Sequence, residues 1–164
     1  MKTVGVIMGS DSDWSVMSEA VKILEDFALS FEVKISSAHR TLERTLDWVA
    51  GFERQGGQII IAGAGLAAHL PGVIAGATTL PVIGVPLRSG ALEGVDALYA
   101  IVQMPPGVPV ATVGIGAARN AGLLAVQILA LAAPPLREKL TEYRRKMAEE
   151  IERKDALLHQ KLNS

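Results

Sequence analysis

The stretch QIIIAG at residues 58–63 decides the fold of this chain. Its apolar residues follow one another without alternation, as in a strand that is covered on both faces. Four more short runs, rich in β-branched or alternating apolar residues, have the character of strands: 3–8, 31–35, 81–85 and 109–115. These runs predict a sheet of five strands.

Segments with helical spacing of apolar residues separate the five strands. The predicted helices cover residues 13–29, 42–56, 66–78, 94–103 and 117–132. Strands that alternate with helices form βαβ units, in which the strands are parallel and helices cover both faces of the sheet. The sequence therefore predicts an α/β fold of the flavodoxin-like, three-layer kind with a five-stranded parallel sheet, although it does not give the order of the strands.

The segment that follows Pro134 and Pro135 differs from the rest of the chain, because it is strongly charged and carries only one narrow apolar stripe. Such a helix packs either on its own domain or on a neighbouring subunit. We favour the neighbouring subunit, and we divide the chain into a catalytic domain, 1–133, and an amphipathic helix for oligomer packing, 134–164. The stripe consists of Leu136, Leu140, Tyr143, Met147, Ile151, Leu158 and Leu162.

Composition narrows the range of functions. The formal net charge is −1, which gives no electrostatic footprint for nucleic acid or an anionic membrane surface. The chain has no cysteine, which excludes disulfides, thiolate catalysis and cysteine-bound metals. Its apolar runs are too short for a secretory signal or a comfortable membrane span. We expect a cytoplasmic protein without nucleic-acid or membrane partners.

In open parallel sheets, ligands bind beyond the carboxyl ends of the strands. The segments that follow the first four predicted strands should therefore share one rim. They read GSDSD (9–13), SSAHR (36–40), GAGLAAHLPG (63–72) and PLRSGALEG (86–94).

Each of these segments has a structural explanation and a functional one. Ser10 and Asp13 suit helix capping, but a serine hydroxyl also suits a phosphate and a carboxylate suits sugar hydroxyls. Arg40 can donate two parallel hydrogen bonds to a phosphate, and His39 can transfer protons near neutral pH. The structural explanation is that both are ordinary surface side chains. The small residues around His69 allow either tight packing or close approach of a ligand.

Taken together, the motifs resemble those of the N5-carboxyaminoimidazole ribonucleotide mutase family, the catalytic subunit of phosphoribosylaminoimidazole carboxylase. The resemblance runs from residue 3 to about 131. It rests on MGSDSDW (8–14), SAHRT (37–41), AGAG (62–65), AAHLPG (67–72), PVIGVP (81–86), the run from Ser89 to Val113, and NAGLLAVQIL (120–129).

The resemblance implies an isomerase of de novo purine (IMP) biosynthesis. Such enzymes decarboxylate the carbamate substrate, hold the CO2 and attach it to ring carbon C4, with one histidine as general acid and base and with no cofactor or metal. The family forms homo-octamers whose C-terminal helices pack on neighbours. It acts after an ATP-dependent synthetase that makes the carbamate.

The resemblance also implies roles for individual residues. His39 is the general acid and base, and His69 helps to position the carboxylate. Asp13 takes the ribose hydroxyls, with Asp11 also expected in the substrate site. Phosphate binding and the lining of the CO2 pocket fall to two groups: Ser10, Ser37 and Arg40 for the phosphate, and Gly63, Gly65, Leu66 and Ala67 for the pocket.

Two positions depart from the family pattern. Leu66 stands where the family usually has glycine, so it adds bulk and a Cβ at a position where the backbone is expected to need a positive φ. Leu42 replaces a proline early in a helix, a milder change because leucine propagates helices well. Two alternatives stay open: a carboxylase that uses aminoimidazole ribonucleotide and CO2 directly, and a non-catalytic flavodoxin-like binding module.

Overall fold

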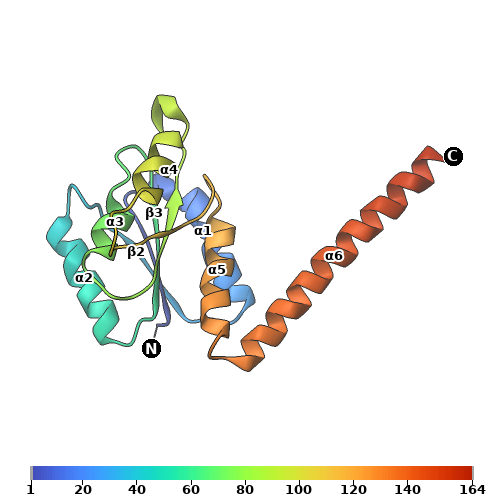
Figure 1. Cartoon of the computed structure of the whole chain (residues 1–164), viewed down its shortest axis with the longest axis horizontal. Helices are drawn as coiled ribbons and strands as arrows, with labels where there is room; N and C mark the ends of the chain where they lie inside the picture. Colours follow the sequence, from blue (N-terminus) through green and yellow to red (C-terminus); the bar gives the residue numbers. More distant parts are fainter. Residues whose placement is uncertain (1, 164) are drawn as a thin grey trace. The chain divides into compact units, whose positions relative to one another are not determined.

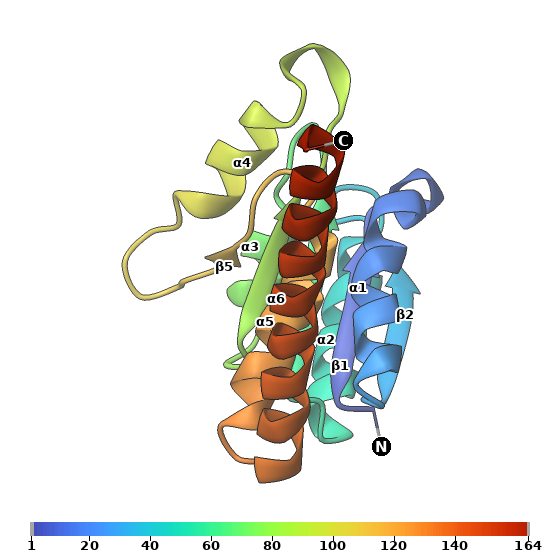
Figure 2. The same ribbon diagram turned by 90° about the vertical axis from the view of Figure 1, so that its right-hand side faces the viewer.

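The structure, a computed structural model, describes residues 2–163. Within them the chain forms two compact units that divide after Ala125. The first unit is a sheet with helices on both faces (Figures 1 and 2). The strands are β1 (Val4–Met8), β2 (Phe31–Ile35), β3 (Ile59–Ala64), β4 (Val82–Pro86) and β5 (Ala111–Thr112). The helices of the chain are α1 (Trp14–Asp26), α2 (Leu42–Arg54), α3 (Leu70–Ala75), α4 (Val95–Val102), α5 (Ala118–Ala130) and α6 (Pro134–Leu162), with short 3₁₀ helices η1 (Asp11–Asp13) and η2 (Gly90–Leu92).

All five strands are parallel, and their order in the sheet is β2-β1-β3-β4-β5. This is the flavodoxin-like order, so the predicted fold class is confirmed. Every residue of β1, β3 and β4 is buried, as expected of strands with helices on both sides. The order reverses between β1 and β3, and ligands of such sheets bind at the carboxyl side of that point.

The two faces of the sheet are covered by different helices. Helix α1 and the first half of α5 lie on one face, and α2, α3 and α4 lie on the other (Figure 1). Glycines in the strands let these helices approach closely. A Cβ on Gly5 would lie 2.7 Å from Trp48 of α2, and a Cβ on Gly84 would lie 2.4 Å from Ile101 of α4.

Two predicted boundaries are wrong. The helix predicted from residue 66 begins at Leu70, because Leu66 has a φ of +33°, which a right-handed helix cannot contain. The strand predicted over 109–115 pairs with β4 only at Ala111 and Thr112. Its first residue, Pro109, has no N–H for a ladder bond. Beyond Thr112 the chain turns at Gly116, whose φ is +71°.

The second unit contains the end of α5 and the whole of α6. Helix α6 has 29 residues, and ion pairs between successive turns support it, among them Lys154 with Glu150 at 2.7 Å. Part of the predicted apolar stripe is exposed to solvent, namely Met147, Ile151, Leu158 and Leu162. No helix in residues 2–163 has the length and apolar character that crossing a bilayer requires. The division at 133/134 and the docking of this helix stay predictions.

The close contact at Gly84 gives a test of the packing. We expect Gly84→Ala to destabilise the protein by about 1–3 kcal/mol, since an added methyl group in a filled core forces neighbours to move. The matched control is Gly51→Ala inside α2, where the nearest atom lies 4.0 Å from the added carbon. Alanine favours helices over glycine, so the control should be neutral or slightly stabilising. Urea unfolding measures both, and equal midpoints would contradict the tight contact between β4 and α4.

Candidate active site

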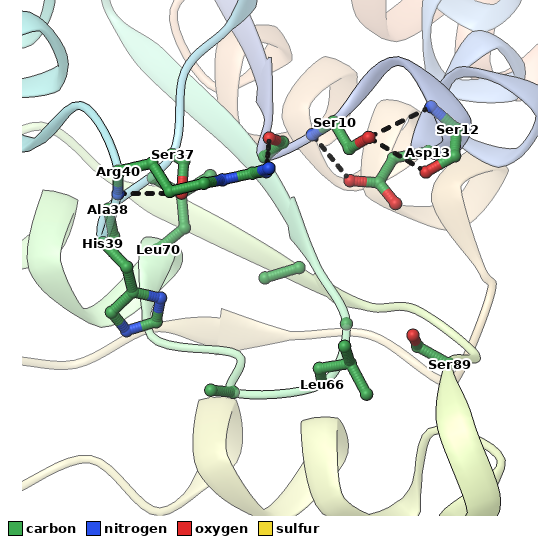
Figure 3. A pocket seen from close by; sticks show the side chains of 14 residues that line it. Ser10, Ser12, Asp13, Ser37, Ala38, His39, Arg40, Leu66, Leu70 and Ser89 are labelled. Atoms are coloured by element: carbon green, nitrogen blue, oxygen red, sulfur yellow. Dashed lines mark hydrogen bonds between the residues drawn. The ribbon is translucent and has the colours of Figure 1, made fainter.

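The loops that follow β1, β2, β3 and β4 meet around one cavity of about 490 Å³ (Figure 3). It is lined by Gly9, Ser10, Ser12, Asp13, Ser37, Ala38, His39, Arg40, Ala64, Gly65, Leu66, Ala67, Leu70 and Ser89. An adjoining hollow of about 360 Å³ shares four of these residues, Gly9, Ser10, Ser37 and Arg40, and adds Asp11, Ile35, Ser36, Thr41 and Arg44. The segments singled out in the sequence therefore do share one rim.

The loop after β1 caps a helix and also lines the cavity. The Ser10 hydroxyl accepts a hydrogen bond from the Ser12 N–H at 3.4 Å, and the Ser10 N–H donates to Asp13 Oδ2 at 3.1 Å. These reciprocal bonds form a capping box at η1. Ser10 and Asp13 nevertheless line the cavity as well. Capping thus fixes both side chains at its wall.

Burial of the Asp13 carboxyl raises its pKa above the ordinary value. The negative charge of Asp11 acts in the same direction. Hydrogen bonds from the backbone N–H groups of Ser10 and Gly9, and the positive charge of Arg40, oppose the rise without cancelling it. The protein therefore stabilises the ionised form of the Asp13 carboxyl less well than water does.

Arg40 connects two of the loops. Its guanidinium reaches from the loop after β2 to the loop after β1, where Nη2 donates to the Gly9 carbonyl at 3.0 Å (Figure 3). An arginine side chain carries five N–H donors, so this bond leaves others for an anion in the cavity. The Arg40 backbone is held as well, because its N–H donates to the Ser37 hydroxyl at 3.3 Å.

Hydrogen bonds of serine and threonine hydroxyl groups hold the loop after β2 in place. The Thr41 hydroxyl accepts from the Ser37 N–H at 2.9 Å, and the buried hydroxyls of Ser36 and Thr45 lie 2.8 Å apart. Thr45 is fully buried on α2. The loop that presents His39 is thus anchored to the helix that follows it.

The two histidines predicted at the site form a pair. His39 Nε2 and His69 Nδ1 lie 2.8 Å apart, and the ring planes are inclined by 75°. His39 lines the cavity, with its ring beneath the Arg40 side chain in Figure 3. His69 is not among the lining residues and contacts the site through His39. One ring nitrogen of each histidine is thereby committed to the other.

The small residues after β3 divide into two groups. Gly65 and Ala67 line the cavity, together with Leu66, which has a positive φ of +33° and is 62% exposed. Gly63 does not line it. That residue lies inside β3 and faces α1, where a Cβ would lie 2.4 Å from the sulfur of Met17. The place of Gly63 is therefore explained by packing.

Sequence reasoning gave no role to several polar residues near the site, among them Arg44 and Ser89. Arg44 lines the adjoining hollow, and its position one helical turn after Arg40 could have indicated this. Ser89 lines the main cavity from the loop after β4. Its segment was expected at this rim, but no role was expected of Ser89 itself. Asp11, which was predicted at the site, lies in the hollow and not in the main cavity.

Comparison with known proteins gives consistent matches. A family model described as AIR carboxylase matches residues 3–150. A protein of Pyrococcus abyssi named N5-carboxyaminoimidazole ribonucleotide mutase is 58% identical over 147 residues, 90% of this chain and 84% of that protein. A protein of the same name from Thermotoga maritima is 51% identical over 160 residues, 98% of this chain and 94% of that protein. The crystal structure of Treponema denticola PurE is 27% identical, with a TM-score of 0.87 over 95% of this chain and 98% of that one.

These matches confirm the resemblance drawn from the motifs. The family model covers most of the chain, and both relatives share more than half of the aligned residues with it. Three of the motifs that carry the resemblance, those after β1, β2 and β3, supply most of the residues that line the cavity. This chain belongs to the AIR carboxylase family.

Proposed function

We propose that this protein is an isomerase of de novo purine biosynthesis that converts N5-carboxyaminoimidazole ribonucleotide into 4-carboxy-5-aminoimidazole ribonucleotide. The observation that carries the proposal is His39, which His69 holds at 2.8 Å, in a cavity that the Arg40 side chain also lines. A proton-transferring side chain beside a phosphate-binding one is what a ribonucleotide substrate with a labile carbamate requires.

The polar part of the cavity suits the ribose phosphate. Ser10, Ser37 and Arg40 bind the phosphate, and Arg44 adds a second positive charge from the adjoining hollow. Asp13 accepts from the ribose hydroxyls. Since burial already raises the pKa of this carboxyl, hydroxyl donors would replace the water that it has lost.

One histidine serves both proton transfers. Protonated His39 gives its proton to the exocyclic nitrogen as the N–C bond breaks, so that the bonding pair stays on nitrogen and the carboxylate leaves as CO2. The electron-rich C4 then attacks CO2 and forms the new C–C bond. Neutral His39 removes the C4 proton, which restores the aromatic ring and returns His39 to its starting state. Atoms and charge balance without an oxidant or a further reactant.

The histidine contact supports one choice of the His39 nitrogen that exchanges protons with the substrate. His39 Nε2 is held by His69 Nδ1, so Nδ1 of His39 is the atom left for the substrate. If Nε2–H donates to His69 throughout, His39 gains and loses its proton only at Nδ1. His69 then stays neutral and acts by fixing the ring and its tautomer. This is a positioning role, whereas His69 was first expected to position the carboxylate itself.

A second function has one observation in its favour. The family model bears the description AIR carboxylase, and a carboxylase would use the same cavity for aminoimidazole ribonucleotide and CO2. The names of the relatives favour the mutase. The two functions differ in the substrate that each consumes, so one assay separates them.

We further propose that the protein works in the cytoplasm as a homo-octamer and follows an ATP-dependent synthetase that supplies the carbamate. The exposed stripe of α6, including Met147 and Ile151, supports docking on a neighbouring subunit, as does the unusual length of this helix. The division of labour would then be a catalytic domain at 1–133 and an assembly helix at 134–164.

The first test is conversion of fresh N5-carboxyaminoimidazole ribonucleotide without ATP or added bicarbonate. We expect His39→Asn to lower kcat by about 10²–10⁴-fold, the usual contribution of a general acid–base group. The control is His159→Asn, which changes an exposed histidine on α6 and should leave kcat unchanged. Product formed only from aminoimidazole ribonucleotide with bicarbonate would instead establish the carboxylase.

The second test concerns the phosphate. We expect Arg40→Gln to raise KM by about tenfold or more, the usual effect of losing a hydrogen bond to a charged group. Arg44→Gln should raise KM by about fivefold at most, because exposed charge pairs are worth about 1 kcal/mol or less. Arg54→Gln at the far end of α2 is the charge-matched control. A KM for Arg44→Gln equal to that of the control would remove Arg44 from the site.

The third test concerns assembly. Light scattering should give the wild type a mass of about eight chains, and Ile151→Glu should lower it, since a carboxylate in an apolar interface is strongly disfavoured. Arg153→Glu places a carboxylate on the opposite side of α6 and should leave the mass unchanged. A monomeric wild type, or equal masses for both variants, would contradict docking through the stripe.

A further inference from the structure

The charged side chains around the phosphate end of the site balance one another. Arg40 lines both the main cavity and the adjoining hollow, and Arg44 lines the hollow. Each arginine is matched by a carboxylate, Asp13 in the cavity and Asp11 in the hollow. These four are the only Asp, Glu, Lys or Arg residues that line the two spaces in the part of the chain that the structure describes. Their formal charges sum to zero, whereas a site that attracts anions by charge alone would be positive.

The Asp11 carboxylate is bonded to a group that is proposed to bind the phosphate. Its Oδ1 accepts a hydrogen bond from the Ser10 hydroxyl at 3.1 Å and another from the Ser12 N–H at 3.0 Å. Ser10 and Arg40 line both spaces, so the phosphate would lie where the cavity and the hollow meet (Figure 3). Asp11 therefore competes for the hydroxyl hydrogen that a phosphate oxygen would accept.

The charge of Asp11 also acts on the cavity itself. It contributes to the raised pKa of the Asp13 carboxyl, of which burial is the larger cause. A nearby negative charge disfavours any further negative charge, and this effect applies to a bound anion as it does to Asp13. Arg44 acts in the opposite sense from the same hollow. One phosphate group adjoins both arginines, but a second group would have to enter the hollow beside Asp11.

We propose that Asp11 determines how much anionic charge the site accepts, so that the single 5′-phosphate of a ribonucleotide is bound and a 5′-diphosphate is rejected. Size does not exclude a second phosphate, because the hollow measures about 360 Å³ and a water molecule takes only about 30 Å³. The inference rests on the proposed function for the place of the 5′-phosphate. It gives Asp11 the opposite effect to a binding residue, since loss of its charge strengthens anion binding.

Calorimetric titration with ribose 5-phosphate and ribose 5-diphosphate tests the role of Asp11, because the two ligands differ by one phosphate group. We expect the wild type to bind the monophosphate more tightly. Asp11→Asn should lower the Kd of the diphosphate by about fivefold, the upper range for one exposed charge pair, and that of the monophosphate by less. Asparagine keeps an oxygen that can accept from the Ser12 N–H, so the variant isolates the charge.

Salt separates a charge effect from a change in loop structure. The screening length falls from about 30 Å at about 0.01 M salt to about 3 Å at about 1 M salt. The ratio of the diphosphate Kd of the wild type to that of Asp11→Asn should therefore approach one at high salt. A variant whose loop had merely rearranged would keep the same ratio throughout.

The control is Asp26→Asn, which removes one negative charge from the exposed last residue of α1. This variant should bind both ligands as the wild type does, because Asp26 lines neither the cavity nor the hollow. Thermal unfolding checks that each variant is folded. Asp11→Ser removes the same charge, keeps a hydroxyl acceptor and takes the place of Asp11→Asn if that variant does not fold.

The outcomes separate this inference from the proposed function. An unchanged preference between the two ligands in Asp11→Asn, or weaker binding of both, overturns the role of Asp11 and leaves the isomerase intact. Equal tightening in Asp26→Asn overturns it as well, since the net charge of the protein would then suffice. So does a wild type that prefers the diphosphate or binds neither ligand. A wild type that selects the monophosphate but converts no carbamate overturns the proposed function alone.

Discussion

The parallel pairing of β1 with both β2 and β3 is the constraint on which the rest of the structure depends. Met8 at the end of β1 lies opposite Ile35 on one side and Gly63 on the other. The carboxyl ends of β1, β2 and β3 therefore lie at the same edge of the sheet, and the loops that follow them are neighbours. A slip of one residue would turn Gly5 away from Trp48 and put a larger side chain against it, so the register and the meeting of the loops are fixed together.

Much of the fold could be predicted because the signals are local. Runs of apolar residues in β1, β3 and β4 and helical spacing in α1 and α2 are properties of neighbouring residues. The start of α3 could not be predicted from periodicity, since Leu66 continues an apolar pattern while its backbone leaves the helical region. Glycine would have signalled a break at that position, and leucine conceals it.

Local sequence patterns also fail to predict contacts in the site between residues that are far apart in the chain. His39 and His69 are 30 residues apart, and each can be suspected from its own loop. Their hydrogen bond, and with it the choice of His39 nitrogen, depends on how two strands place two loops, which no local pattern encodes. Arg44 was missed for a related reason. Its charge resembles that of any solvated helix face until the hollow beside Arg40 is seen.

Two energetic costs of this unit lie at the end of the sheet where the loops meet. Asp13 is held where burial raises its pKa, and Leu66 is held at a positive φ. Neither arrangement stabilises the folded state. Both persist because the surrounding structure imposes them. The capping box fixes Asp13, and close packing against Gly90 fixes Leu66. The buried strands supply the stability that offsets these costs. A bound ligand would stabilise both groups. Hydroxyl donors would replace the water that the Asp13 carboxylate has lost, and an apolar molecule would cover the exposed Leu66 side chain. In the proposed function, the ribose of the substrate supplies the hydroxyl donors and CO2 is the apolar molecule.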